Sequence, residues 1–347
     1  MSPYLVLVSG SRSDSPTSLR CEISPLNSRS PYLLDCHVDT LLRVLDEGAD
    51  LDRGIPEGHV DLDRLEAGGV RILFFSLWPS LDYLPDHSFE RAMALGGALL
   101  AQIELHPQRM GLARTMQEAR DLVAEGKLAA MMGVEGGHAI EEDLGKLRAL
   151  ADIGVRYMTL TWNNHLSWAE SCQKPKDGSP QGLTSFGRRV LEEMHTLGVT
   201  ADCSHVSPKT LRDVLAMDLP APICSHSAAR AVHDHCRNLA DAEIEALAAK
   251  GGAVGLVLYP GFLAEGAAGL PETLAHAEHI LRVGGSSVLG IGSDFDGIEQ
   301  GPEGLEDCTG LAGLVDAVAQ RCGLTDEEKA GVAHANLMRV FEAWESV

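Results

Sequence analysis

The sequence predicts a (β/α)8 TIM barrel with a metal site at the C-terminal ends of its strands. Eight short apolar runs alternate with helix-like stretches, over roughly the 300 residues that such a barrel needs. Several runs end in a side chain that can bind a metal, and in a barrel the C-terminal strand ends meet at one face. An open doubly wound sheet is the alternative, but no Gly-x-Gly-x-x-Gly follows the first run.

The predicted strands are short, apolar, and bounded by polar or glycine-containing segments. In chain order they cover residues 32–36, 70–77, 128–134, 157–161, 199–203, 221–224, 253–259 and 288–292. The clearest helices between them cover 185–197, 207–216, 241–249 and 271–283. Ser207 followed by Pro208 marks one helix start, because serine caps a helix and proline suits its first position.

Residues 1–30 form a predicted irregular N-terminal extension, since they are rich in Ser, Pro and Arg without periodicity. Residues 31–347 are expected to form a single (β/α)8 domain that contains the metal site, because no linker interrupts the alternating pattern.

Composition excludes some partners. The net charge of −22 disfavours binding to a nucleic-acid backbone. Eight cysteines without a Cys-x-x-Cys pair indicate no disulfide framework and favour a reducing compartment. No signal peptide, membrane-spanning run or lipid-anchor motif is recognisable, so we expect a cytoplasmic protein with no membrane partner. The oligomeric state stays open, a homodimer included.

The first candidate metal ligands lie on or at the ends of two predicted strands. His37 and Asp39 stand two apart on one strand and therefore point to the same face; the alternative is a strand-end histidine and a helix-capping aspartate. Glu135 leaves a buried strand ahead of two glycines, and its charge needs a cation or hydrogen bonds there. Its alternative role is to cap a loop amide.

Two histidines repeat this placement. His205 and His226 end consecutive predicted strands among serines, where each is either a neutral imidazole ligand or a packed histidine. Asp294 leaves the last strand, placed to accept a proton from a metal-bound water. Asp296 fits an Asx-type turn, and His138 fits a loop histidine.

Arg237 lies eleven residues after His226, in a loop over the predicted mouth of the barrel. It is either a solvated charge or a bidentate clamp for a carboxylate. The candidate ligands are too many for one tetrahedral site. They suit two metal ions bridged by a carboxylate, a centre that hydrolyses amides or esters.

From about residue 32 to 344 the chain resembles the renal (membrane) dipeptidase family of the amidohydrolase superfamily. The matching segments are Asp-Cys-His-Val-Asp-Thr (35–40), Gly-Val-Glu-Gly-Gly-His (133–138), Gly-Val-Arg-Tyr-Met-Thr-Leu-Thr (154–161), Ser-His-Val-Ser (204–207), Ser-His-Ser-Ala-Ala-Arg-Ala (225–231) with Arg237-Asn238, and Gly-Ile-Gly-Ser-Asp-Phe-Asp-Gly (290–297). Their order and spacing make the resemblance specific.

The resemblance implies two Zn²⁺ ions, one bound by His37 and Asp39 and the other by His205 and His226, with Glu135 bridging them. It implies that Asp294 handles protons beside a bridging hydroxide and that Arg237 holds the C-terminal carboxylate of a dipeptide. The superfamily often bridges its metals with a lysine from the fourth strand. Residues 159–162 contain no lysine, which agrees with Glu135 in that role.

One position departs from the family pattern. Trp162 stands where renal-type members have a histidine that polarises the scissile carbonyl, and an indole cannot act as a cationic donor. His165, Asn163 or Asn164 are candidates for the missing hydrogen bond, and we favour His165. Trp162 and His165 are therefore predicted substrate contacts.

These observations rank three functions. The leading one is a two-zinc dipeptidase acting on dipeptides with a free C-terminal carboxylate. The second is a related amidohydrolase for N-acyl amino acids, lactams or another amide conjugate, which the departure at Trp162 motivates. The third is a metal-dependent binding protein without turnover.

Overall fold

The computed structural model describes residues 32–174 and 181–345. The predicted extension over residues 1–30 lies outside the described residues. The strands are β1 Leu33–Val38, β2 Val70–Leu77, β3 Met110–Leu112, β4 Leu128–Glu135, β5 Val155–Thr159, β6 Thr200–Asp202, β7 Ile223–Ser227, β8 Ala253–Leu256 and β9 Leu289–Ile291.

Thirteen α-helices occur in the same described ranges. They are α1 Leu41–Glu47, α2 Leu62–Ala67, α3 Ser88–Leu105, α4 Met116–Ala124, α5 Leu144–Ile153, α6 Ser185–Thr196, α7 Pro208–Leu215, α8 Asp241–Lys250, α9 Pro260–Leu263, α10 Leu270–Gly284, α11 Leu311–Cys322, α12 Asp326–Ala330 and α13 Asn336–Glu345.

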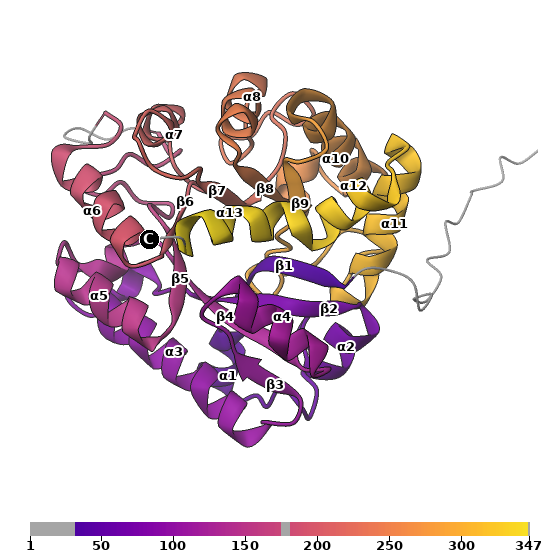
Figure 1. Cartoon of the computed structure of the whole chain (residues 1–347), viewed down its shortest axis with the longest axis horizontal. Helices are drawn as coiled ribbons and strands as arrows, with labels where there is room; N and C mark the ends of the chain where they lie inside the picture. The colour runs from indigo at the N-terminus through magenta and orange to yellow at the C-terminus, as the bar shows by residue number, and fades with distance from the viewer. Residues whose placement is uncertain (1–31, 175–180, 346–347) are drawn as a thin grey trace, which may run out of the picture.

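The strands close into a parallel barrel surrounded by helices (Figure 1). The closed order is β1-β2-β4-β5-β6-β7-β8-β9, because β4 pairs with both β2 and β5 and β1 pairs with both β2 and β9. The prediction of a (β/α)8 barrel is confirmed. Each predicted strand run overlaps one of these eight strands.

Two details differ from the prediction. β3 is an additional short strand that pairs with the beginning of β4 outside the closed ring. β8 ends at Leu256 rather than continuing to 259, because Tyr259 caps α9 and Pro260 occupies its first turn.

The barrel interior is a packed core. Every residue of β1, β4 and β7 is buried, as expected for parallel strands covered on both sides. The largest core cluster among the described residues runs from Leu33 to Trp344.

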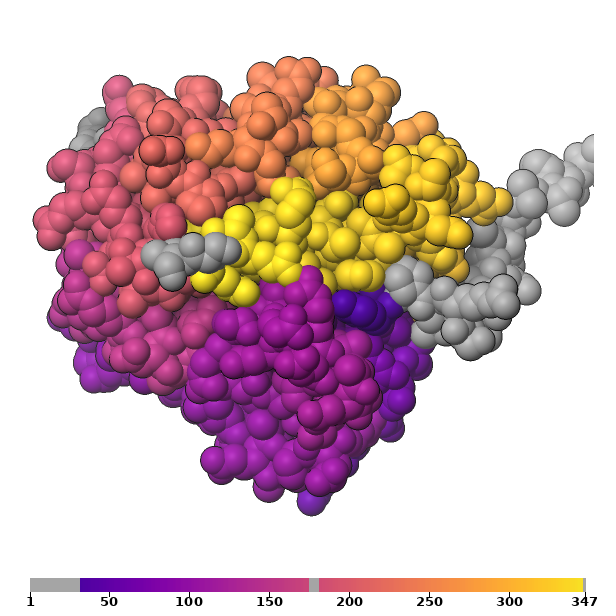
Figure 2. Space-filling view, viewed as in Figure 1, coloured from indigo at the N-terminus to yellow at the C-terminus, as the bar shows by residue number. Residues whose placement is uncertain are grey.

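Helix α13 lies across the barrel in Figure 1, and in Figure 2 its yellow atoms fill the centre of this face. Phe341 of α13 stacks on Phe74 of β2 with ring centroids 4.5 Å apart. The Trp344 indole donates to the carbonyl of Ala221, just before β7. The helix therefore covers the N-terminal ends of the strands, and the candidate site lies at the other end. Of the helices described, none combines the length and apolar character needed to span a membrane.

Candidate metal centre

The predicted ligands and Asp294 gather at the C-terminal ends of the strands. His37 is in β1 with Asp39 just beyond it, Glu135 ends β4, His205 follows β6, His226 is in β7 and Asp294 follows β9. The five predicted ligands are at most 6% exposed. Barrel closure therefore brings together side chains that are up to 257 positions apart.

Glu135 lies between two groups of candidate ligands. On one side His37 Nε2 is 3.7 Å from Glu135 Oε2 and 3.4 Å from Asp39 Oδ2. On the other side Glu135 Oε1 is 2.9 Å from His205 Nε2 and 3.3 Å from His226 Nε2. Each side is a set of three potential ligand atoms close enough to hold one ion.

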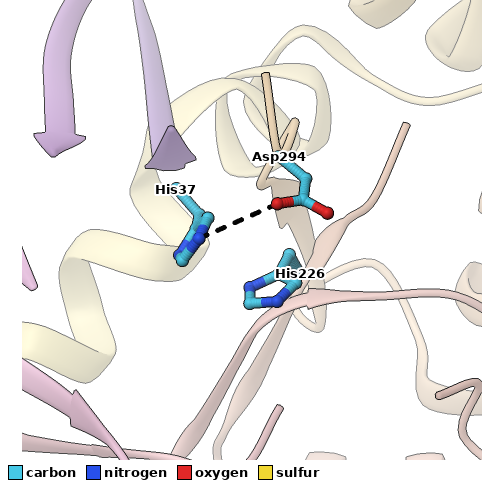
Figure 3. A group of neighbouring side chains, drawn as sticks. All are labelled: His37, His226 and Asp294. Carbon is cyan, nitrogen blue, oxygen red and sulfur yellow. Dashed lines mark ion pairs between the residues drawn. The ribbon is translucent and has the colours of Figure 1, made fainter. Parts of the chain in front are cut away.

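Asp294 joins a third such set with His37 and His226 (Figure 3). Its Oδ1 lies 3.8 Å from His37 Nε2. The three sets share His37, Glu135 and His226, so they form one continuous cluster.

The histidine rings are held from behind. His37 Nδ1 lies 2.7 Å from Tyr157 Oη, His205 Nδ1 3.1 Å from Asn163 Oδ1, and His226 Nδ1 2.8 Å from Ser225 Oγ. All three Nε2 atoms consequently point into the cluster. Hydrogen bonds of this kind orient imidazole rings at metal sites.

The cluster contains two acceptor atoms that face each other and further polar atoms without a hydrogen-bond partner. The carbonyl oxygen of Asn163 only accepts, so His205 carries its proton on Nδ1 and a lone pair on Nε2. That lone pair faces a carboxylate oxygen of Glu135 at 2.9 Å. His37 Nε2 and Asp39 Oδ1 are buried without a hydrogen-bond partner. A metal cation would satisfy these atoms, so the residues fit a metal centre.

The pKa shifts of these side chains are those expected at a site that binds a cation. Burial raises the pKa of Glu135 well above its usual range and that of Asp294 to about 7. Burial lowers the pKa of His205 and His226, which keeps both imidazoles neutral. For His37, burial is outweighed by Glu135 and Asp39, and its pKa rises to about 10. Its Nε2 therefore carries a proton toward these carboxylates, and a bound cation would take the place of that proton.

The backbone is strained at two of these positions. His205 and Asp294 both have a φ of 66°, in the left-handed region that residues other than glycine rarely adopt. Position 297 requires glycine, because a Cβ atom there would lie 2.2 Å from Asp39 Oδ2 and clash with it. The local conformation is thus constrained around the cluster.

Arg237 lies beside the cluster and is 4% exposed. Its Nη2 donates to the carbonyl of His226 at 3.0 Å, and its guanidinium lies over the Phe262 ring. Its Nε has no partner. Among the described residues, no carboxylate forms an ion pair with this buried charge.

The segment after β5 contains the position that departs from the family pattern. Trp162 packs against Trp78 with ring centroids 5.0 Å apart and lies 6.3 Å from the His205 ring. His165 instead bonds within its own loop: Nδ1 accepts from the Ser171 amide and Nε2 donates to the Lys174 carbonyl. Of the three candidates for the missing hydrogen bond, Asn163 is the one that contacts a candidate ligand.

Asp296 and His138 have structural contacts. The buried Asp296 carboxylate accepts from Thr40 Oγ1, Arg43 Nε and the His59 amide. Asp296 lies in a turn, as predicted, with a φ of 64°, but the side-chain bonds described go to distant groups and not to the local amide of an Asx-type turn. His138 lies in the 3₁₀ turn Gly137–Ile140 and donates from Nε2 to the Pro79 carbonyl.

Sequence reasoning missed Tyr157 and Ser225, and it did not connect Asn163 with His205. Ser225 directly precedes a predicted ligand, and this proximity was the available signal. Tyr157 is 120 positions from His37, and only barrel closure brings the two together.

Comparison with known proteins agrees with the fold and the motifs. The family model of the membrane dipeptidases (peptidase family M19) matches residues 21–347. Mouse dipeptidase 3 is 37% identical over 329 residues, which cover 91% of this chain and 65% of the relative. An uncharacterised dipeptidase of Schizosaccharomyces pombe is 32% identical, covering 91% and 79%. The chain thus spans less than two thirds of the length of the mouse relative.

Two solved structures extend the comparison. The dipeptidase AC metallopeptidase of family M19 has a TM-score of 0.84 and 28% identity, covering 92% of this chain and all of that chain. A Rhodobacter sphaeroides metallopeptidase, liganded with a phosphinate mimic of the dipeptide L-Ala-D-Ala, has a TM-score of 0.82 and 28% identity, covering 90% and 99%. The predicted resemblance is confirmed: the chain belongs to the membrane dipeptidase family, peptidase family M19.

Proposed function

We propose that the protein is a two-zinc dipeptidase that hydrolyses dipeptides with a free C-terminal carboxylate. The observation that carries this proposal is the contact between the His205 lone pair and the Glu135 carboxylate, two acceptors 2.9 Å apart. Family membership, and the dipeptide mimic bound by the Rhodobacter relative, support dipeptides as the substrate class.

The residues divide naturally between two ions. His37 and Asp39 would hold one, His205 and His226 the other, and Glu135, whose two oxygens face the two groups, would contact both. Neutral imidazole and carboxylate ligands suit zinc. Bound zinc would supply Lewis acidity and lower the pKa of a shared water to about 7, so that hydroxide is available at neutral pH.

Asp294 would manage the proton. Its carboxylate lies 3.8 Å from His37 Nε2. Among the bonds described, no group donates a hydrogen bond to it. It would take the proton that the attacking water loses and deliver it to the nitrogen of the departing amine. The products are the two free amino acids.

Arg237 would bind the C-terminal carboxylate of the substrate. Its guanidinium is buried beside His226 and has an unpartnered Nε, and a bidentate carboxylate is the usual partner of such a group. A peptide extended beyond the second residue would lack a carboxylate at this position, so dipeptides should be preferred.

The test measures metal and activity on one sample. Elemental analysis is combined with an assay against a dipeptide library, before and after chelation. We expect about two zinc ions per chain and cleavage that chelation abolishes and zinc restores. His226→Gln should lose zinc and cleavage together, whereas His87→Gln, an exposed histidine, should lose neither. A chain that binds no zinc even after zinc is added contradicts the proposal.

A second function is favoured by one observation, the indole of Trp162 near His205. If zinc is bound but the dipeptide library is not cleaved, N-acyl amino acids and lactams are the next substrates to assay. Turnover of one of these would make the protein an amidohydrolase for another amide. If the protein bound the phosphinate dipeptide mimic tightly but hydrolysed none of the dipeptides, N-acyl amino acids or lactams, it would be a binding protein.

A further inference from the structure

Asp202 is a buried carboxylate that the proposed reaction does not use. It ends β6 and is 0% exposed. Oδ1 accepts from the backbone amides of Ser204 and Ser225, at 2.9 and 2.8 Å. Oδ2 accepts from Thr159 Oγ1 and Ser225 Oγ, at 2.5 and 2.6 Å. Four donors therefore surround this carboxylate, and each of its oxygens accepts two hydrogen bonds.

The bond to Ser225 fixes the direction of a second bond. A serine hydroxyl has one proton, and a carboxylate has none to offer. The proton between Ser225 Oγ and Asp202 Oδ2 therefore belongs to Ser225. Ser225 Oγ can then only accept from its other two neighbours, His226 Nδ1 at 2.8 Å and Ser204 Oγ at 3.2 Å. His226 must carry its proton on Nδ1, which leaves a lone pair on Nε2.

We infer that Asp202 and Ser225 are positioning residues that hold His226 as its Nδ1–H tautomer, with Nε2 free to bind a metal. Nε2 is the atom that faces Glu135 and His205. The metal-binding part of this inference rests on the proposed function; the tautomer itself does not. Two buried side chains on adjacent strands thus determine which nitrogen of His226 enters the cluster.

The chain contains a matched pair without this connection. Ser293 Oγ donates to the buried Asp35 at 2.5 Å, and the Ser293 amide donates to the same carboxylate. Among the bonds described, Ser293 and Asp35 contact the backbone of His37 but no histidine ring. Ser293→Ala therefore removes a similar buried bond, between β1 and the segment after β9, and is the control for general loss of stability.

The metal readout compares Ser225→Ala with Ser293→Ala. Zinc affinity is measured by competition with a chromophoric chelator, together with zinc content after dialysis. Loss of the group behind a ligating histidine typically weakens binding about 10- to 100-fold. We expect this loss at one of the two ions in Ser225→Ala and not in Ser293→Ala. Equal affinities in the two variants would overturn the inference.

Asp202→Asn gives a sharper test. The two backbone amides require an acceptor at Oδ1, so the new NH₂ group would replace Oδ2 and donate to Ser225 Oγ. The Ser225 proton would then turn to His226 Nδ1, which at 2.8 Å is nearer than the Ser204 hydroxyl at 3.2 Å, and leave the imidazole proton on Nε2. An asparagine in place of a histidine-orienting aspartate produces such a wrong tautomer in serine proteases. We expect weaker zinc binding than in Ser225→Ala.

The tautomer is read directly by NMR of the metal-free protein with ¹⁵N-labelled histidine, with His226 assigned through His226→Gln. Protonated Nδ1 in the natural sequence, lost in Asp202→Asn, supports the inference even if no zinc is bound and the proposed function fails. Protonated Nε2 in the natural sequence overturns it while leaving the proposed function standing. The natural sequence alone decides this point, so a variant that fails to fold does not weaken the test.

Discussion

Arg237 combines burial with an incomplete set of partners. Its guanidinium donates to a backbone carbonyl and lies over Phe262, yet Nε has no acceptor. If a substrate carboxylate completes this set, Arg237→Ala should lower kcat/KM for dipeptides. Truncating one partner of a buried charge pair costs roughly 2–5 kcal/mol, so we expect a loss of about 30-fold or more, measured by steady-state kinetics.

Two comparisons make this prediction specific. The natural enzyme should discriminate strongly against dipeptides with an amidated C-terminus, and Arg237→Ala should discriminate much less. Arg230→Ala is the control, because Arg230 lies in the same loop and bonds the carbonyls of His235 and Cys236. Equal losses in both variants, or unchanged discrimination in Arg237→Ala, would contradict the assignment.

At the residue scale, sequence patterns identified the candidate ligands more readily than the residues that hydrogen-bond to those ligands. Glu135 and His205 could be predicted because each interrupts or ends an apolar run. Tyr157 and Asn163 could not, because each acts through one contact that barrel closure creates. The preference for His165 followed chemical type alone, whereas the path of its loop directs both ring nitrogens elsewhere.

At the element scale, strands were predictable because burial on both faces makes them continuously apolar. β3 was not, since three residues paired with one edge of β4 leave too short a pattern. The ends of elements depended on local caps, as Tyr259 and Pro260 show for β8. Side-chain bonds between elements, which hold the loops of the site in place, left no periodic signal.

The loop after β9, which carries Asp294, is held in position by the hydrogen bonds of Asp296. Asp296 joins it to α1 through Thr40 and Arg43 and to the segment at His59. Asp296→Ala removes the buried carboxylate that Thr40, Arg43 and the His59 amide bond. Arg43 keeps Glu47 as a partner, and leaving a buried donor unsatisfied costs about 1–3 kcal/mol. Urea unfolding should show this loss, and kcat should fall because Asp294 is no longer held.

The matched control for that loop is Glu299→Ala, an exposed carboxylate three positions further on. Exposed substitutions of this kind usually change stability by less than about 0.5 kcal/mol. If Asp296→Ala unfolded at the same urea concentration as Glu299→Ala, the bonds of Asp296 would not stabilise the loop.

At the scale of the whole molecule, the cluster concentrates unfavourable charge in the core. Glu135 is buried and its pKa is raised well above the usual range, mainly by that burial. A carboxyl group whose pKa is higher in the folded than in the unfolded protein destabilises the fold as pH rises from the unfolded value. Bound zinc would reverse this effect, so metal binding and folding should be strongly linked.

This linkage predicts the response of thermal unfolding to metal. Zinc at 100 times its Kd should add about 2.7 kcal/mol per site, and for 347 residues this raises Tm by about 4 °C per site. Chelation should remove the gain. Glu135→Gln should show no zinc-dependent rise, yet its metal-free form should melt at or above the Tm of the metal-free natural protein, because a neutral amide replaces a buried acid. A lower metal-free Tm in Glu135→Gln, or an equal zinc-dependent rise in both proteins, would show that Glu135 supports the fold rather than the metal.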